Sequence, residues 1–166
     1  MRVVFIHGAF SRDGAWWWAP TAALLDRSGI ESVAMALPSC GEAGIAPTGA
    51  GPGLDEDAAA MTAVLDEGGP AIVVAHSYGG IVASQAGEHP AVRGLVYISS
   101  LLPAVGETLA GLSSGATNPV PIIPHANGSV SVNADAAAMA CLSPTAARRR
   151  ASPSASRSRQ RGRMSR

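Results

Sequence analysis

The sequence contains no lysine, and all twelve of its basic residues are arginine. Charged residues make up 14% of the 166 residues, well below the usual quarter of a globular protein. Residues 1–144 carry four arginines against all twelve acids, whereas residues 145–166 carry eight arginines and no acid. The formal net charge of zero therefore conceals two different kinds of sequence.

Cysteine is scarce, and long hydrophobic runs are absent. Cys40 and Cys141 form neither a CxxC pair nor a metal-ligand spacing, so we expect free thiols in a reducing compartment. No run reaches the eighteen apolar residues of a membrane span, and Met1 leads directly into an apolar stretch without the features of a signal peptide. These absences predict a soluble, cytoplasmic protein that does not bind membranes.

Four short apolar runs are rich in β-branched residues and show no clean period-two alternation. This pattern is typical of strands that are buried on both faces of a parallel sheet. The runs are Val3–His7, Ser32–Leu37, Ala71–Ala75 and Gly94–Ser99.

Helical periodicity falls between these runs, over residues 17–28, over residues 54–65 and from Ser77 to about His89. We expect Pro20 in the first turn of the first of these helices. Alternating strands and helices predict an α/β fold with a parallel sheet and helices on both faces.

The C-terminal part has a different character. Asn127-Gly128 between short extended pieces predicts a two-residue hairpin, and Asn133 predicts the N-cap of a further helix. Residues 143–166 are rich in arginine, serine and proline and have almost nothing to bury, so we expect a disordered tail. No aromatic residue interleaves the arginines, which favours a solvated tail over a nucleic-acid-binding arm.

The motif Ala75-His76-Ser77-Tyr78-Gly79 directly follows a predicted strand. A nucleophilic serine needs a sharp strand-to-helix turn, which exposes Oγ and points the next N–H at the developing oxyanion. Alanine stands where the pattern G-x-S-x-G has its first glycine, and a methyl group is the smallest change available. A serine that merely caps a helix would fit the pentapeptide alone, but the position between strand and helix favours Ser77 as a nucleophile.

The stretch "HGAF" follows the first predicted strand. Gly8 lets the backbone approach the serine, and the Ala9 N–H is then the natural second oxyanion donor. We interpret His7 as a structural residue at the end of the strand rather than as a catalytic base.

Three stretches resemble the α/β-hydrolase superfamily, and within it the small esterase branch that contains plant methylesterases and hydroxynitrile lyases. They are "VVFIHGAFSRDGAWWW", "IVVAHSYGGIVASQAGEHPAVRGLVYISSLLPAVGET" and "GSVSVNADAAAMA", and the likeness covers about residues 2–140.

The resemblance implies an esterase with Ser77 as nucleophile and the amides of Ala9 and Tyr78 as oxyanion donors. It also implies a hydrolase domain over residues 1–142, in which residues 103–140 form a cap. Hydroxynitrile lyases of this branch carry threonine where this chain has Gly8, which favours ester hydrolysis. The implied substrate is a small hydrophobic ester, and no metal or organic cofactor is implied. The tryptophans at 16–18 line the pocket or fill the helix–sheet interface, and we expect at least one in the core.

The rest of a catalytic triad is not evident. In this fold the acid and then the histidine follow the serine along the chain. His89 lies about 18 Å along a helix from Ser77 and cannot reach its Oγ, and His125 matches no family position. The remaining candidates after the serine are the acids Glu88, Glu107 and Asp135. The sequence therefore predicts a chain truncated at the C-terminus, without the last strands, the acid and the base, and with impaired activity.

The change of composition near residue 141 suggests a frame change in GC-rich DNA. Reading the other frames past codon 141 for a strand, an aspartate and a late histidine tests this hypothesis. Two alternatives to an esterase remain: a non-catalytic pseudo-hydrolase and an arginine-tailed nucleic-acid binder. The incomplete sheet also predicts self-association through an exposed apolar edge at Gly94–Ser99.

Overall fold

The structure is a computed structural model of the chain, and it describes residues 1–41, 51–115 and 122–133. The chain divides into two compact units, residues 1–132 and residues 133–166. Of the second unit only Asn133 is described. The predicted disordered tail over 143–166, the helix expected after Asn133 and Cys141 lie outside the described residues.

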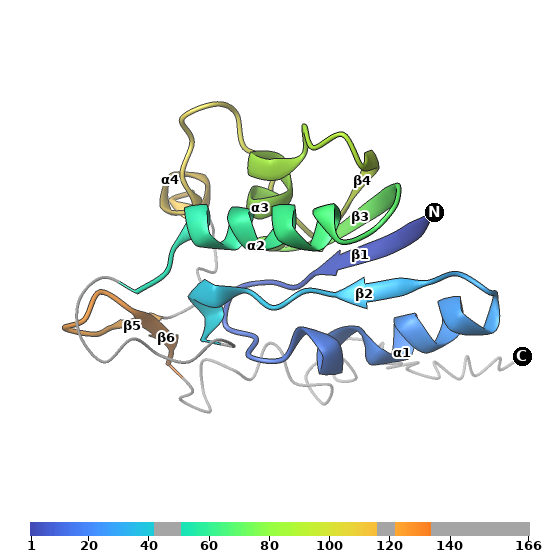
Figure 1. Cartoon of the computed structure of the whole chain (residues 1–166). Coiled ribbons are helices and arrows are strands. Elements are labelled where there is room, and N and C mark those ends of the chain that lie inside the picture. The colour runs from blue at the N-terminus through green and yellow to red at the C-terminus, as the bar shows by residue number, and fades with distance from the viewer. Residues whose placement is uncertain (42–50, 116–121, 134–166) are drawn as a thin grey trace, which may run out of the picture. The chain divides into compact units, whose positions relative to one another are not determined.

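A four-stranded parallel sheet in the order β2-β1-β3-β4 forms the centre of the first unit (Figure 1). Its strands are β1 (Arg2–Ile6), β2 (Ser32–Ala34), β3 (Ala71–His76) and β4 (Val92–Ile98). The helices are α1 (Gly14–Arg27), the 3-10 helix η1 (Pro38–Cys40), α2 (Leu54–Asp66), α3 (Gly79–Ala86) and α4 (Leu109–Ser113). An antiparallel hairpin consists of β5 (Ile122–Pro124) and β6 (Val130–Val132). The predicted parallel α/β fold is confirmed.

The helices cover both faces of the sheet, with α1 on one face and α2 and α3 on the other (Figure 1). Successive side chains of a strand point to opposite faces. Val4 and Ile6 of β1 accordingly lie in the main core cluster with buried residues of α2 and α3. Phe5 points the other way and stacks on Trp18 of α1, with ring centroids 4.5 Å apart. The expectation that one tryptophan fills the helix–sheet interface is therefore confirmed.

The sheet ends at β4 within the described part of the chain. β4 pairs with β3 alone among the described strands, in parallel register with Val96 opposite Val74. Val96 and Ile98 are 44% and 43% exposed. The predicted apolar edge is thus present, whereas self-association through it stays a prediction.

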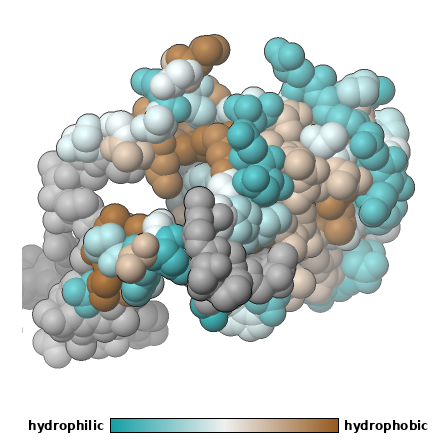
Figure 2. Space-filling model, turned by 60° about the vertical axis from the view of Figure 1, so that its left-hand side comes forward, coloured by the Kyte–Doolittle hydropathy of each residue, from teal (hydrophilic) through white to brown (hydrophobic). Residues whose placement is uncertain are grey.

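The segment after β4 is largely exposed to solvent. Most of its described residues are exposed, and Leu102 and Val105 present large apolar side chains to solvent. The surface in Figure 2 accordingly shows separate hydrophobic patches among hydrophilic side chains. The short helix α4 in this segment was not expected from the sequence; it begins where the Thr108 side chain accepts a hydrogen bond from the Gly111 N–H.

The start of α1 differs from the sequence prediction. Asp13 is its N-cap, because the Asp13 carboxylate accepts a hydrogen bond from the Trp16 N–H at 2.8 Å. The helix therefore begins at Gly14, and Pro20 lies inside it rather than in its first turn. The expected position of Pro20 was wrong because a capping side chain, and not the proline, fixes the start.

Other boundaries also moved. β1 and β4 begin and end one or two residues earlier than predicted, β3 ends one residue later, and α3 ends at Ala86 rather than near His89. β2 ends at Ala34 instead of Leu37, and α3 begins at Gly79, after the serine rather than at it. In the hairpin, His125 and Ser129 pair through the His125 N–H at 2.9 Å, and Gly128 takes a φ of +79°. The loop therefore has three residues with a left-handed glycine at the end, and not the two predicted.

Candidate active site

Ser77 lies in the turn between β3 and α3, and its backbone is left-handed. Its φ is +53°, in a region that costs a residue with a Cβ about 1–2 kcal/mol. The Ser77 N–H donates to the Ile98 carbonyl at the end of β4 (3.4 Å), and the Ser100 hydroxyl donates to the Ser77 carbonyl (2.6 Å). The neighbouring strand thus holds the serine in a conformation that it would otherwise avoid, and the side chain remains half-exposed.

Small residues around Ser77 allow this turn to pack tightly. A Cβ on Gly8 would lie 2.9 Å from the Ser77 Cβ, and a Cβ on Gly79 would lie 2.6 Å from the His7 carbonyl oxygen. Both distances are shorter than real Cβ contacts. Ala75 is fully buried between β1 and β4, where its methyl group is accommodated. The structure therefore brings the "HGAF" turn directly against the serine.

Two main-chain N–H groups next to Gly8 and Ser77 in the sequence have no hydrogen-bond acceptor among the described residues. Within the described parts of the chain, neither the Ala9 nor the Tyr78 N–H donates a hydrogen bond. Tyr78 directly follows Ser77 and is the N-cap of α3, and Ala9 directly follows Gly8. Unpaired N–H groups at such a turn are the kind of donor that stabilises an oxyanion.

The phenol of Tyr78 belongs to a buried polar network that the sequence did not reveal. It donates to the carboxylate of Asp57 at 2.7 Å, and Asp57 also accepts hydrogen bonds from the main-chain N–H and the hydroxyl of Ser39. Asp57 is completely buried. Burial raises the pKa of Tyr78, and the hydrogen bond to the Asp57 carboxylate raises that pKa further. A signal was available, because Asp57 is an acid four residues before Met61 on the apolar face of its helix.

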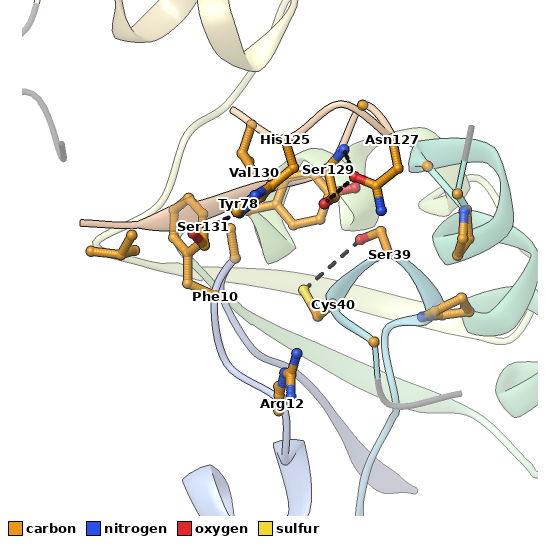
Figure 3. Close-up of a pocket in the computed structure, with 18 of the residues that line it drawn as sticks. Phe10, Arg12, Ser39, Cys40, Tyr78, His125, Asn127, Ser129, Val130 and Ser131 are labelled. Carbon is orange, nitrogen blue, oxygen red and sulfur yellow. Dashed lines mark hydrogen bonds between the residues drawn. The ribbon is translucent and has the colours of Figure 1, made fainter. Parts of the chain in front are cut away.

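A cavity of about 700 Å³ lies beside these groups. Ala9 and Tyr78 line it, whereas Ser77 is not among its lining residues. Figure 3 shows Phe10 and Tyr78 next to residues of the β5–β6 hairpin, with Ser39 of η1 across from them. The rest of the lining is mixed. Apolar residues are Pro38, Pro52, Leu109, Val130 and Val132, and polar or charged ones are Arg12, Ser39, His125, Asn127, Ser129 and Ser131. The cavity therefore adjoins the two N–H groups, and the hairpin forms one of its walls.

The histidines nearest the serine are held by other groups. His7 is buried at the end of β1, and its Nδ1 lies 2.8 Å from the Gly8 carbonyl oxygen. His76 packs its ring on Trp17 at 5.4 Å, and its buried Nδ1 has no hydrogen-bond partner among the described residues. Burial, with a smaller effect of the charge on His7, lowers the pKa of His76. Neither ring forms a described hydrogen bond with the hydroxyl of Ser77.

The remaining histidines and acids after the serine lie elsewhere. His89 pairs with Asp66 at 3.0 Å, and His125 bonds the Ser131 hydroxyl at 2.9 Å on the hairpin. The Glu107 carboxylate accepts from the Ala104 N–H, Glu88 is exposed, and Asp135 lies outside the described residues. None of the described histidines or carboxylates bonds Ser77.

The described residues contain no group of three or more histidine, cysteine or acidic side chains that could hold a metal ion. None of the described helices has the length and hydrophobicity that crossing a bilayer requires.

Comparison with known proteins supports the architecture. A family model described as the alpha/beta hydrolase family matches residues 3–164. A probable hydrolase of Phoma sp. is 34% identical over 114 residues, which cover 64% of this chain and 45% of that protein. A pyrethroid hydrolase structure has a TM-score of 0.66 at 25% identity and is similar over 84% of this chain and 59% of its own.

Tomato methylketone synthase I is similar over 75% of this chain and 51% of its own, with a TM-score of 0.56 at 23% identity. A polyneuridine aldehyde esterase is also among the structural neighbours. The chain thus spans about half the length of the known proteins that it matches. The family match over almost all of the chain, together with the parallel sheet and the strand–serine–helix turn, shows that the chain belongs to the alpha/beta hydrolase family.

Proposed function

We propose that the protein is a carboxylic-ester hydrolase in which Ser77 is the nucleophile and the N–H groups of Ala9 and Tyr78 form the oxyanion hole. The observation that carries the proposal is the left-handed backbone of Ser77 between β3 and α3. A serine stays in this strained region only where its surroundings hold it there, and such residues cluster at active sites.

The proposed reaction has two steps. The Ser77 Oγ attacks the ester carbonyl carbon, and the carbonyl electron pair moves onto oxygen, where the two N–H groups stabilise the negative charge. The proton of the attacking hydroxyl passes to solvent water. The tetrahedral intermediate then collapses with cleavage of the ester C–O bond, and the leaving alkoxide takes up a proton from water. Water then attacks the acyl-enzyme, which releases the acid and restores the serine hydroxyl.

Among the described residues, His89 bonds Asp66 and His125 bonds Ser131, so neither is placed to take the proton of Ser77. In subtilisin, removal of the catalytic histidine costs about 10⁶ in kcat, while the oxyanion hole and substrate binding retain roughly 10³–10⁴ over water. We therefore propose an impaired activity, limited to activated esters. The expected rate rises with pH as the small alkoxide fraction of Ser77 grows.

A small hydrophobic ester is the proposed substrate class. The cavity beside Ala9 and Tyr78 is lined in part by apolar side chains, among them Leu109, Val130 and Val132, and is large enough for a molecule of this kind. A Cβ at Gly8 would lie 2.9 Å from the Ser77 Cβ, so the threonine that hydroxynitrile lyases carry there would require this turn to shift. This close contact supports hydrolysis over cyanohydrin cleavage.

The test is covalent labelling of Ser77 with an alkyl fluorophosphonate, followed by mass spectrometry of the peptides. The reaction forms the Oγ–P bond and breaks the P–F bond, so fluoride leaves and the hydroxyl proton passes to water. We expect a slow adduct on Ser77 in the wild type and in Ser84→Ala, and none in Ser77→Ala. Hydrolysis of p-nitrophenyl acetate, measured on the same proteins, should be slow.

Two outcomes would contradict the proposal in different ways. An adduct on another residue, or none at all, would exclude Ser77 as the nucleophile. Rapid alkyl-ester hydrolysis that Ser77→Ala abolishes would show instead that a base acts on the serine. His125 would then be the first residue to replace, since it lines the same cavity.

A further inference from the structure

Asp57 differs from the acids beside it in the first turn of α2. Asp55 and Glu56 are exposed, as acids at a helix N-terminus usually are, whereas Asp57 is completely buried. A buried carboxylate is costly unless hydrogen bonds replace its water. The carboxylate of Asp57 accepts three such bonds, so its burial is satisfied and its oxygens are fixed in place.

The three donors come from two other segments. The Ser39 N–H bonds Oδ1 at 2.9 Å, and the hydroxyls of Ser39 and Tyr78 bond Oδ2 at 2.5 and 2.7 Å. Ser39 belongs to η1, and Tyr78 lies in the turn before α3. Asp57 therefore ties the first turn of α2 to η1 and to the turn that contains the serine.

Tyr78 connects this network to the proposed reaction. Its N–H is one of the two proposed oxyanion donors, and its phenol is the group that Asp57 holds. A tyrosine side chain has only two χ angles, so a fixed phenol and a fixed ring restrict the position of its own main chain. Because burial and the neighbouring carboxylate raise the pKa of Tyr78, the phenol stays a hydrogen-bond donor across the physiological range.

We propose that Asp57 is a positioning residue for the oxyanion hole, which acts by anchoring the Tyr78 phenol and thereby aiming the Tyr78 N–H. The inference rests on the proposed function of Ser77. Asp57 touches no substrate and carries no proton in the reaction. Its effect is on the geometry of one donor, so its loss slows attack at the serine without removing the serine.

The experiment compares four proteins: the wild type, Tyr78→Phe, Asp57→Asn and the double variant. The two constants measured are the maximal rate of fluorophosphonate labelling at Ser77 and the reagent concentration at half that rate. Loss of an entire oxyanion donor costs about 10²–10³ in rate, so a misaimed donor should cost roughly tenfold. We expect the maximal rate to fall by about this factor, with the half-saturating concentration little changed.

The double-variant cycle separates positioning from general destabilisation. If Asp57 acts through the phenol, the double variant labels no more slowly than the slower single variant, because both changes remove the same link. Additive losses would overturn the proposal. All rates are measured on protein whose circular dichroism shows it folded.

Tyr97→Phe is the matched control. It removes the chain's other phenol, which bonds Ser84 of α3 at 2.9 Å, whereas the described hydrogen bonds of Asp57 come from Ser39 and Tyr78. We expect its labelling rate to equal that of the wild type. An equal loss in Tyr97→Phe would show that any phenol bond to α3 has the same effect, and would overturn the proposal.

The Tyr97→Phe background also provides a spectroscopic readout, because Tyr78 is then the single tyrosine. We expect Asp57→Asn to lower the pKa of Tyr78 in an ultraviolet titration, and an unchanged pKa would show that the bond does not form in solution. If Asp57→Asn does not fold, the labelling rate of Tyr78→Phe tests the proposal by itself, because this variant keeps the hydrogen bonds between Asp57 and Ser39. An unlabelled wild-type Ser77 would refute the proposed function, whereas a labelled Ser77 with unchanged rates in the variants would refute only the role of Asp57.

Discussion

Replacing Ser77 by glycine or by alanine separates the strain of its backbone from the chemistry of its hydroxyl. Both changes remove Oγ and should abolish labelling at this position. They differ in backbone preference, because glycine takes a positive φ freely and alanine does not. At a φ of +53° we therefore expect Ser77→Gly to be the more stable variant.

The magnitude follows from two opposing contributions. The left-handed conformation costs alanine about 1–2 kcal/mol, while the freer unfolded chain costs glycine about 0.4–1 kcal/mol. The difference should be about 1 kcal/mol in favour of glycine. At Ser84, inside α3, the order should be reversed, because glycine in a helix is about 1 kcal/mol worse than alanine.

The assay is urea denaturation of the four variants, two at each position. With a denaturant dependence of about 1–3 kcal/mol per molar urea, a difference of 1 kcal/mol moves the midpoint by roughly 0.5 M. The expected shifts have opposite signs at the two positions. If alanine is the better residue at both, Ser77 is not held in a left-handed turn in solution and the argument for its role as a nucleophile loses its basis.

Three further predictions concern packing, the sheet edge and pH. Trp18→Ala removes the ring stacked on Phe5 and should lower the free energy of unfolding by about 3–5 kcal/mol, whereas truncating the exposed Trp16 should change it little. Val96→Lys places a charge on the exposed face of β4 and should reduce self-association, as measured by sedimentation velocity. An unchanged distribution of sedimentation coefficients would show that any self-association uses another surface. Because burial lowers the pKa of His76 in the folded chain below its ordinary value of 6.5, the unfolded chain binds more protons near that pH. The free energy of unfolding should therefore be fully retained above pH 6.5 and fall as the pH drops toward the lowered pKa. His76→Gln should reduce this dependence of the unfolding free energy on pH. An unchanged dependence would contradict its assignment to His76.

The order of strands and helices and the turn at Ser77 could be predicted because both leave local signals. Strand and helix repeats are visible within a few residues, and the small residues around "HSYGG" mark a turn that follows a buried strand. The same local reasoning placed Pro20 and the hairpin loop incorrectly. The capping side chain of Asp13 fixes the start of α1, and the left-handed Gly128 fixes the length of the hairpin loop. Several residue types are compatible with such turns, so the sequence alone does not locate them.

The position of Asp57 on the apolar face of its helix was a signal of a buried acid, but its partners could not be predicted, because they are distant in sequence. Asp57 bonds Ser39 and Tyr78 across 18 and 21 positions, and only the packing of α2 against η1 and α3 brings them together. The sequence also could not assign separate roles to the three adjacent tryptophans, because the groups that lie beside each of them are fixed only by the tertiary structure. Trp18 lies on Phe5, Trp17 lies on His76, and Trp16 faces solvent. The sequence by itself determined the parallel α/β fold and the turn at the serine, because strands, helices and this turn each leave a local pattern of residue types. Tertiary packing decided which polar groups are buried beside that turn, since burial depends on chain segments that no local pattern relates.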